Sequence, residues 1–73
     1  MTAASASRLV AELPKNAKEV IRVTRDTWEG RELVNARVWF RNDEGEWKPG
    51  RQGIAVRVDL AADLARAIEE AAR

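Results

Sequence analysis

Three stretches of the chain alternate apolar and polar residues, which is the pattern of half-exposed β-strands. They cover residues 20–24, 32–41 and 54–58, and the middle one is the strongest. Successive side chains of a strand point to opposite faces, so this stretch has one uniformly apolar side and one side that combines arginine with tryptophan. The apolar side carries Val34, Ala36, Val38 and Phe40, and the other side carries Leu33, Asn35, Arg37, Trp39 and Arg41. We expect the apolar side to pack on a core and the other side to stay exposed.

The C-terminal residues show helical periodicity instead. Apolar residues recur there three and four positions apart and form one narrow stripe. Asp59 is the expected N-cap of this helix. The predicted fold is therefore α+β, with a four-stranded antiparallel twisted sheet followed by one C-terminal helix. The stripe consists of Leu60, Leu64, Ala67, Ile68 and Ala71.

The remaining segments are less regular. Residues 8–13 fit either a strand or a helical turn, and residues 1–14 are predicted to form a flexible or partly ordered extension before a single domain over residues 15–73. Gly30 and Gly45 mark turns. Three glycines and a proline within residues 45–53 are expected to prevent regular structure there, so the last strand is expected to begin at Ile54.

Composition limits how such a chain can be stable. A domain of 73 residues buries only about 60% of its unfolded surface, and the chain has no cysteine for a disulfide. Pairing into a homodimer is the expected additional source of stability. Val38, Leu64 and Ile68 are predicted to be core or dimer contacts.

The same composition excludes several functions. Histidine and cysteine are absent, and with them the commonest zinc ligands and the commonest acid–base catalyst. No phosphate-binding motif such as GxxxxGK[ST] occurs. The acidic residues of the turns have no metal-site spacing. We therefore expect neither enzymatic activity nor a metal or cofactor.

Charge and hydropathy restrict the location and the partners. The chain has 13 basic and 12 acidic residues and a net charge of +1, too balanced to attract nucleic acid as a whole. Residues 15–51 hold nine basic and seven acidic side chains, so a basic surface is expected in the middle of the chain. No apolar run approaches the roughly 20 residues of a membrane span, and residues 1–7 lack the apolar core of a signal peptide. These features predict a cytoplasmic protein, associated with the nucleoid if prokaryotic, with no membrane partner.

The segment GEWKPGRQG, residues 45–53, places Lys48 and Arg51 on an exposed turn beside Trp47. Cations next to flat aromatic rings suit single-stranded nucleic acid, which has a charged backbone and bases that can stack.

Three segments resemble the C-terminal domain of the transcriptional coactivator family called positive cofactor four, in its compact prokaryote-type form. They are WEGR at 28–31, RVWF at 37–40 and DEGEWKPGRQGI at 43–54, and the likeness spans the chain from Lys18 onward. The resemblance implies four antiparallel strands and a C-terminal helix, paired as a homodimer. It also implies that single-stranded DNA binds along the sheets with little sequence preference and in preference to duplex.

The resemblance also assigns the family's basic positions to residues of this chain. One of these positions falls on Gln52, which cannot supply charge, and Arg51 beside it is the expected substitute. For the basic position of the first strand, Arg22, Thr24 and Arg25 all compete. The predicted nucleic-acid-binding residues are Arg22, Arg25, Trp28, Arg31, Arg37, Trp39, Phe40, Lys48 and Arg51.

Two aromatic assignments stay open. The resemblance makes Phe40 a base-stacking residue, whereas strict alternation places it on the apolar side, unless a bulge or a strand end beyond the helix exposes it. Trp28 fits either a stacking residue or a lid on the core. Trp47 is expected to clamp the glycine–proline turn.

The predicted function is binding of single-stranded DNA or RNA in transcription, or in protection of exposed strands during replication or repair, with transcription or repair proteins as further candidate partners. The alternative is a protein-interaction adaptor, because tryptophan and arginine are also enriched at protein–protein hot spots.

Overall fold

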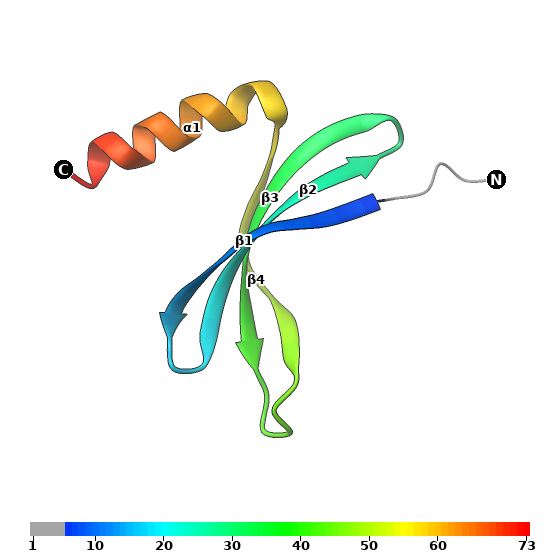
Figure 1. Ribbon diagram of the computed structural model, residues 1–73, viewed down its shortest axis with the longest axis vertical. Helices are drawn as coiled ribbons and strands as arrows, with labels where there is room; N and C mark the ends of the chain where they lie inside the picture. The colour runs from blue at the N-terminus through cyan, green and yellow to red at the C-terminus, as the bar shows by residue number, and fades with distance from the viewer. Residues whose placement is uncertain (1–5) are drawn as a thin grey trace.

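The computed structural model describes residues 6–73. Four strands are followed by one helix, and each strand pairs antiparallel with the next in the order β1-β2-β3-β4 (Figure 1). This arrangement confirms the predicted α+β fold. The elements are β1 (Ala6–Asn16), β2 (Glu19–Trp28), β3 (Arg31–Arg41), β4 (Trp47–Arg57) and α1 (Val58–Ala71).

The turns between the strands follow from local chemistry. Glu29 and Gly30 both have positive φ, 51° and 76°, as a tight two-residue hairpin turn requires. In the β3–β4 turn, the Asn42 side-chain oxygen accepts hydrogen bonds from the backbone N–H groups of Glu44 and Glu46, both at 2.9 Å. Gly45 completes this turn at φ 81°. The predicted turns at Gly30 and Gly45 are therefore confirmed.

The N-terminal strand extends further than the sequence indicated. Residues 8–13, which fitted a strand or a helical turn, are strand and lie within β1. The expected boundary between residues 14 and 15 falls inside this strand, because β1 pairs with β2 from Ala6 to Asn16. Residues 1–5 of the expected extension lie outside the described part of the chain.

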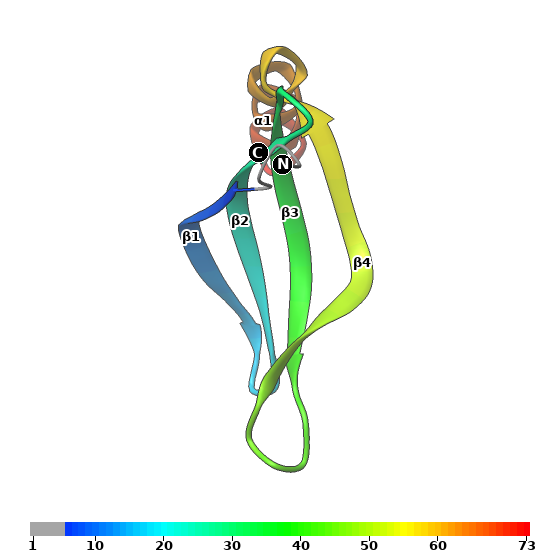
Figure 2. The same ribbon diagram turned by 90° about the vertical axis from the view of Figure 1, so that its right-hand side faces the viewer.

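The start of β4 corrects a prediction. This strand begins at Trp47 rather than Ile54 and includes the whole glycine–proline segment. Proline is tolerated because β4 is an edge strand, where a missing N–H costs no ladder hydrogen bond on the open side. Between the pairs Arg37↔Gly53 and Trp39↔Pro49, three residues of β4 stand opposite one residue of β3. The irregularity is thus a bulge inside a strand, and β4 bows outward from β3 in Figure 2.

The helix also begins earlier than expected. Arg57 is its N-cap residue, and no side chain caps the helix. Asp59, the predicted N-cap, lies in the first turn instead, where its charge still favours the positive end of the helix dipole. In Figures 1 and 2 the helix lies at one end of the twisted sheet, and the β3–β4 turn lies at the other.

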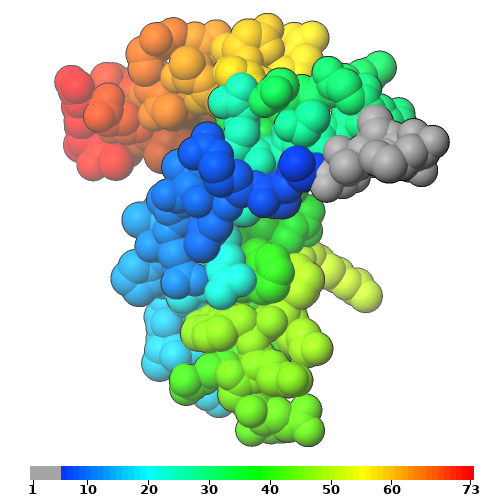
Figure 3. Space-filling model, turned by 45° about the vertical axis from the view of Figure 1, so that its right-hand side comes forward, coloured from blue at the N-terminus to red at the C-terminus, as the bar shows by residue number. Residues whose placement is uncertain are grey.

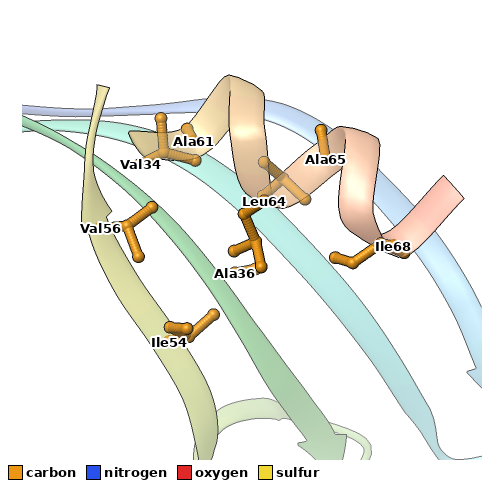
Figure 4. A pocket seen from close by; sticks show the side chains of 9 residues that line it. Val34, Ala36, Ile54, Val56, Ala61, Leu64, Ala65 and Ile68 are labelled. Carbon is orange, nitrogen blue, oxygen red and sulfur yellow. The ribbon is translucent and has the colours of Figure 1, made fainter. Parts of the chain in front are cut away.

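Because the strands alternate, the sheet has two unlike faces. We call the face toward α1 the helix face; between it and the helix is an apolar groove of about 180 Å³ (Figure 4). The opposite side is the open face, which includes Arg22, Thr24, Asn35, Arg37 and Trp39. The groove is lined by Val23, Val34, Ala36, Ile54, Val56, Ala61, Leu64, Ala65 and Ile68.

Within one chain the helix face is not a sealed core. No side chain among residues 6–73 is fully buried, and Ile54 and Ile68 remain 48% and 60% exposed. In the space-filling view the helix and the β2–β3 hairpin form a broad upper part, and the β3–β4 turn lies at the lower end (Figure 3). The predicted contact residues Leu64 and Ile68 do line the groove, whereas Val38 lies beyond it.

Gly53 lets β4 approach β3 closely. A Cβ atom at this position would lie 2.8 Å from the Ala36 carbonyl oxygen and 3.0 Å from Arg37 Cα. We predict that Gly53→Ala lowers the free energy of unfolding by about 1–3 kcal/mol, the usual cost of an inserted methyl group that forces the backbone to move. Thermal denaturation would measure the change. Gln52→Ala, at the exposed neighbouring position, is the control and should melt like the unmodified protein; equal melting of both variants would contradict the close approach.

Candidate nucleic-acid interface

Three of the predicted binding residues meet on the open face. Arg22 of β2 stands directly opposite Arg37 of β3, and Trp39 follows two positions along β3. The Arg22 guanidinium carbon lies 4.5 Å from the centre of the Trp39 ring, within the range of a cation–π contact. These residues line a shallow hollow of about 160 Å³ that also includes Ser7, Thr24, Asp26, Asn35 and Pro49.

Arg22 is held on two sides. Its Nε donates a hydrogen bond to Glu12 Oε1 at 2.8 Å, and its side chain is 25% exposed. Glu12 belongs to β1, so this strand shapes the open face. Sequence reasoning missed Glu12 because residues 8–13 showed no clear alternation. The ion pair offsets part of the Arg22 charge and keeps the guanidinium over the tryptophan ring.

Arg37 is held differently. Its Nη1 donates a hydrogen bond of 3.0 Å to the carbonyl oxygen of Gly50, which lies in the β4 bulge. Within the described chain no carboxylate pairs with Arg37. One N–H therefore anchors the side chain while its positive charge stays uncompensated, which suits a phosphate ligand.

Asn35 adds a polar side chain to the open face. It lies two positions before Arg37 on β3, on the side of the β2–β3 hairpin. It stands opposite Thr24 of β2. Its Oδ1 is shielded from solvent and has no hydrogen-bond partner, a state that costs free energy. Asn35 is one of the residues that line the hollow.

Trp28 and Arg31 lie at the β2–β3 hairpin, away from the hollow. They face each other across the turn, and the Trp28 side chain is 51% exposed. Trp28 lies six positions after Arg22 along β2, which corresponds to roughly 20 Å along a strand. Within one chain Trp28 therefore covers no sealed core, and its role as a stacking residue stays a prediction.

The other predicted residues with a defined face lie on the helix side of the sheet. Arg25 stands opposite Val34 and donates a 2.8 Å hydrogen bond to Glu32. Phe40 is opposite Lys48, and Lys48 Nζ lies 3.8 Å from Glu46 Oε1. Alternation thus places Phe40 correctly, and the strand end beyond the helix leaves it 41% exposed.

Phe40 lines a second hollow of about 230 Å³, together with Arg51, Gln52, Gly50, Val38 and Glu19. The nine predicted binding residues therefore do not form one continuous surface on a single chain. Arg22, Arg37 and Trp39 are brought together, Phe40 and Arg51 line a separate hollow, and Trp28 and Arg31 occupy the opposite end of the sheet.

Glu19 gives the second hollow a negative charge. Its carboxylate accepts hydrogen bonds from Asn16 Nδ2 at 2.7 Å and from Lys15 Nζ at 3.2 Å. The hydrogen bond from Asn16, and after it the one from Lys15, lowers the pKa of Glu19 below its ordinary value of 4.5.

Among residues 6–73 there is no group of three or more acidic, histidine or cysteine side chains that could hold a metal ion. The same residues include no helix long and apolar enough to cross a membrane.

These features define a small α+β domain whose sheet has one open face bearing arginine and tryptophan. The family model described as Transcriptional Coactivator p15 (PC4) matches residues 15–67, so the chain belongs to this family. The resemblance found in the sequence is thereby confirmed. A comparison with curated proteins finds no match.

Solved structures agree with the family assignment. The chain is similar to a PC4 homologue from Burkholderia pseudomallei. In its tetragonal crystal form the TM-score is 0.84 at 29% identity, over 93% of this chain and 100% of that one. In the orthorhombic form the TM-score is 0.83 at 29% identity, over 99% and 97%. A bacteriophage T5 homologue of the eukaryotic coactivator PC4, implicated in recombination-dependent DNA replication, shares the fold with a TM-score of 0.68 at 20% identity, over 88% of this chain and 74% of that one.

The Glu19 hydrogen bonds lead to a test by titration. Because they favour the charged carboxylate, their contribution to stability is present above pH 4.5 and is lost as the pH falls through the lowered pKa of Glu19. We predict that Asn16→Ala raises the pKa of Glu19, as followed by NMR of the side-chain carboxyl carbon. Asn42→Ala removes a similar amide from the β3–β4 turn, where it donates to Glu46 and not to Glu19, and should leave this pKa unchanged. A Glu19 that titrates identically in both variants would contradict the assigned cause.

Proposed function

We propose that this protein is a non-enzymatic homodimer that binds single-stranded DNA with little sequence preference. The observation that carries the proposal is the open face, where Arg37 and the Arg22–Trp39 pair lie side by side and no element of the described chain covers them. Membership of the PC4 coactivator family supports it. Modulation of transcription, or protection of exposed strands in replication and repair, is the proposed cellular role.

The chemistry of the open face favours an unpaired strand. Trp39 offers a ring on which a base can stack, and base–aromatic stacking tolerates every base because each has a π-face. Arg37 would neutralise a phosphate, and Arg22 would exchange Glu12 for one or remain stacked on the ring. In a duplex the base faces are already stacked on each other, so this surface prefers single strands.

The homodimer is proposed from the exposed apolar surface. The accessible area of the chain is 5928 Å², whereas a compact monomer of 8.2 kDa would expose about 4,500 Å². The excess is on the order of a thousand Å² per chain, which matches the large interfaces of obligate dimers. Covering the groove beside α1 with a second copy would bury Ile54, Leu64 and Ile68 and leave the open face free.

We predict that a labelled oligo-dT binds more tightly than a duplex of the same length, and that Trp39→Ala weakens oligo-dT binding by about 5- to 150-fold through the lost base stacking. Fluorescence anisotropy would measure both. Arg66→Gln, on the exposed side of the helix, is the control and should bind normally.

Two outcomes would contradict this proposal. Equal, weak binding of single strands and duplex at moderate salt would remove the preference on which it rests. An adaptor for proteins, the alternative that the sequence left open, would show no quenching of tryptophan fluorescence by oligonucleotide. Parallel titration with an oligoribonucleotide would reveal whether RNA competes as a ligand.

The dimer has its own test. Ile68→Glu places a charge in the apolar groove, and we expect it to convert a particle of twice 8.2 kDa into monomers or to unfold the chain. Sedimentation equilibrium and circular dichroism distinguish these results. Arg66→Gln should keep the dimer mass. An unmodified protein that sediments as a stable monomer, with a melting temperature independent of concentration, would rule out the homodimer.

A further inference from the structure

The open face does not end at Trp39. Arg41 follows Trp39 by two positions on β3 and therefore points to the same face, and Trp47 of β4 stands directly opposite Arg41. The Arg41 guanidinium carbon lies 6.0 Å from the centre of the Trp47 ring. A second arginine–tryptophan pair thus occupies the β3–β4 end of the same surface.

The two pairs are continuous across the sheet. Pro49 stands opposite Trp39, and Trp47 is two positions from Pro49 on the same strand. Residues two positions apart on a strand are about 6.6 Å apart, and diagonal cross-strand neighbours are about 7–8 Å apart. The stacked bases of one strand rise by about 3.4 Å per nucleotide, so one extended nucleotide or two stacked ones would span the interval.

The charge at this end is available to a ligand. Arg41 is exposed, and neither it nor Lys18 has a carboxylate partner among the described residues. Their backbones are joined by a 2.9 Å hydrogen bond from Arg41 N–H to the Lys18 carbonyl oxygen. Both line a polar hollow of about 270 Å³ with Asn42, Asp43 and Gly45. Asp43 also lines this hollow, but no ion pair among the described residues joins it to Arg41 or Lys18, so their charge remains available to a phosphate.

We infer that Trp47 and Arg41 form a second stacking platform for single-stranded DNA, so that the binding path runs along the open face from Arg37 past Trp39 to the β3–β4 hairpin. This inference rests on the proposed function and extends it. It replaces the expectation that Trp47 only clamps the glycine–proline segment. The platform adds at least one base and one phosphate to the site of each chain.

Binding as a function of oligonucleotide length tests the inference. Oligo-dT of increasing length should gain affinity until both platforms are occupied. Trp47→Ala should weaken binding of the longer oligomers by about 5- to 150-fold. It should have little effect on the shortest oligomer whose binding is weakened by Trp39→Ala. Trp47→Phe retains a ring and should restore most of the affinity. Arg41→Gln should reduce the log–log salt slope by about 0.7, the contribution of one phosphate contact.

A spectroscopic measurement keeps the test decisive if Trp47→Ala fails to fold. In a variant with Trp28→Phe and Trp39→Phe, Trp47 is the sole fluorophore, and its emission should be quenched by oligo-dT. A folded variant without quenching, together with an unchanged salt slope in Arg41→Gln, would overturn the second platform. If Trp39→Ala weakens binding in the same assays, the proposed function survives that failure; if the unmodified protein binds no oligonucleotide, the proposed function itself is rejected.

Discussion

The structure depends on a geometric constraint: one helix of 14 residues must cover one face of a sheet whose strands are 10 or 11 residues long. The helix lies at one end of the sheet, so its apolar stripe meets β3 and β4 only near Val34, Ala36, Ile54 and Val56. No described side chain is consequently fully buried. A chain with so little interior has few sources of stability, since it also contains no cysteine for a disulfide and no histidine. The same constraint leaves the opposite face without a covering element from residues 6–73.

The bulge in β4 links this fold to the open face. Gly50 and Gly53 have no side chain where β4 passes close to the carbonyl oxygens of Val38 and Ala36. The bulge directs the Gly50 carbonyl toward Arg37, which it anchors. The segment expected to be irregular therefore shapes the open face through its backbone geometry, by anchoring Arg37. An arginine anchored by a backbone carbonyl keeps its full charge, unlike one paired with a carboxylate.

Local patterns predicted much of the fold. Alternation identified both faces of β3, because that strand pairs on both sides and is regular throughout. Alternation failed for β1 and the first half of β4, which are edge strands with register shifts. Each bulge interrupts the two-residue period of apolar and polar positions. The helix followed from periodicity, although its N-cap residue did not, since Arg57 makes no side-chain cap.

The site was predicted less completely, for a related reason. A resemblance supplies residue types without the face on which each lies, so Trp39 and Phe40 were both candidates although consecutive strand residues point apart. The contribution of Glu12 could not be found, because it depends on the register of an edge strand. Arg41 was recognised on the arginine–tryptophan side, but its partner Trp47 lay in the segment expected to be irregular.

The charge distribution favours the tryptophan rings, rather than the field of the whole molecule, as the main source of affinity in the proposed binding. A net charge of +1 gives little long-range steering, and at physiological salt electrostatic attraction is screened within about 8 Å. On the open face Glu12 pairs with Arg22, and Asp26 accepts a hydrogen bond from Ser7, so acidic groups are interspersed with the cations. For the proposed function, attraction would therefore act only at contact, where an uncompensated guanidinium such as that of Arg37 would meet a phosphate. Stacking on tryptophan is not screened by salt, and on such a surface it would supply the larger and more persistent part of the affinity.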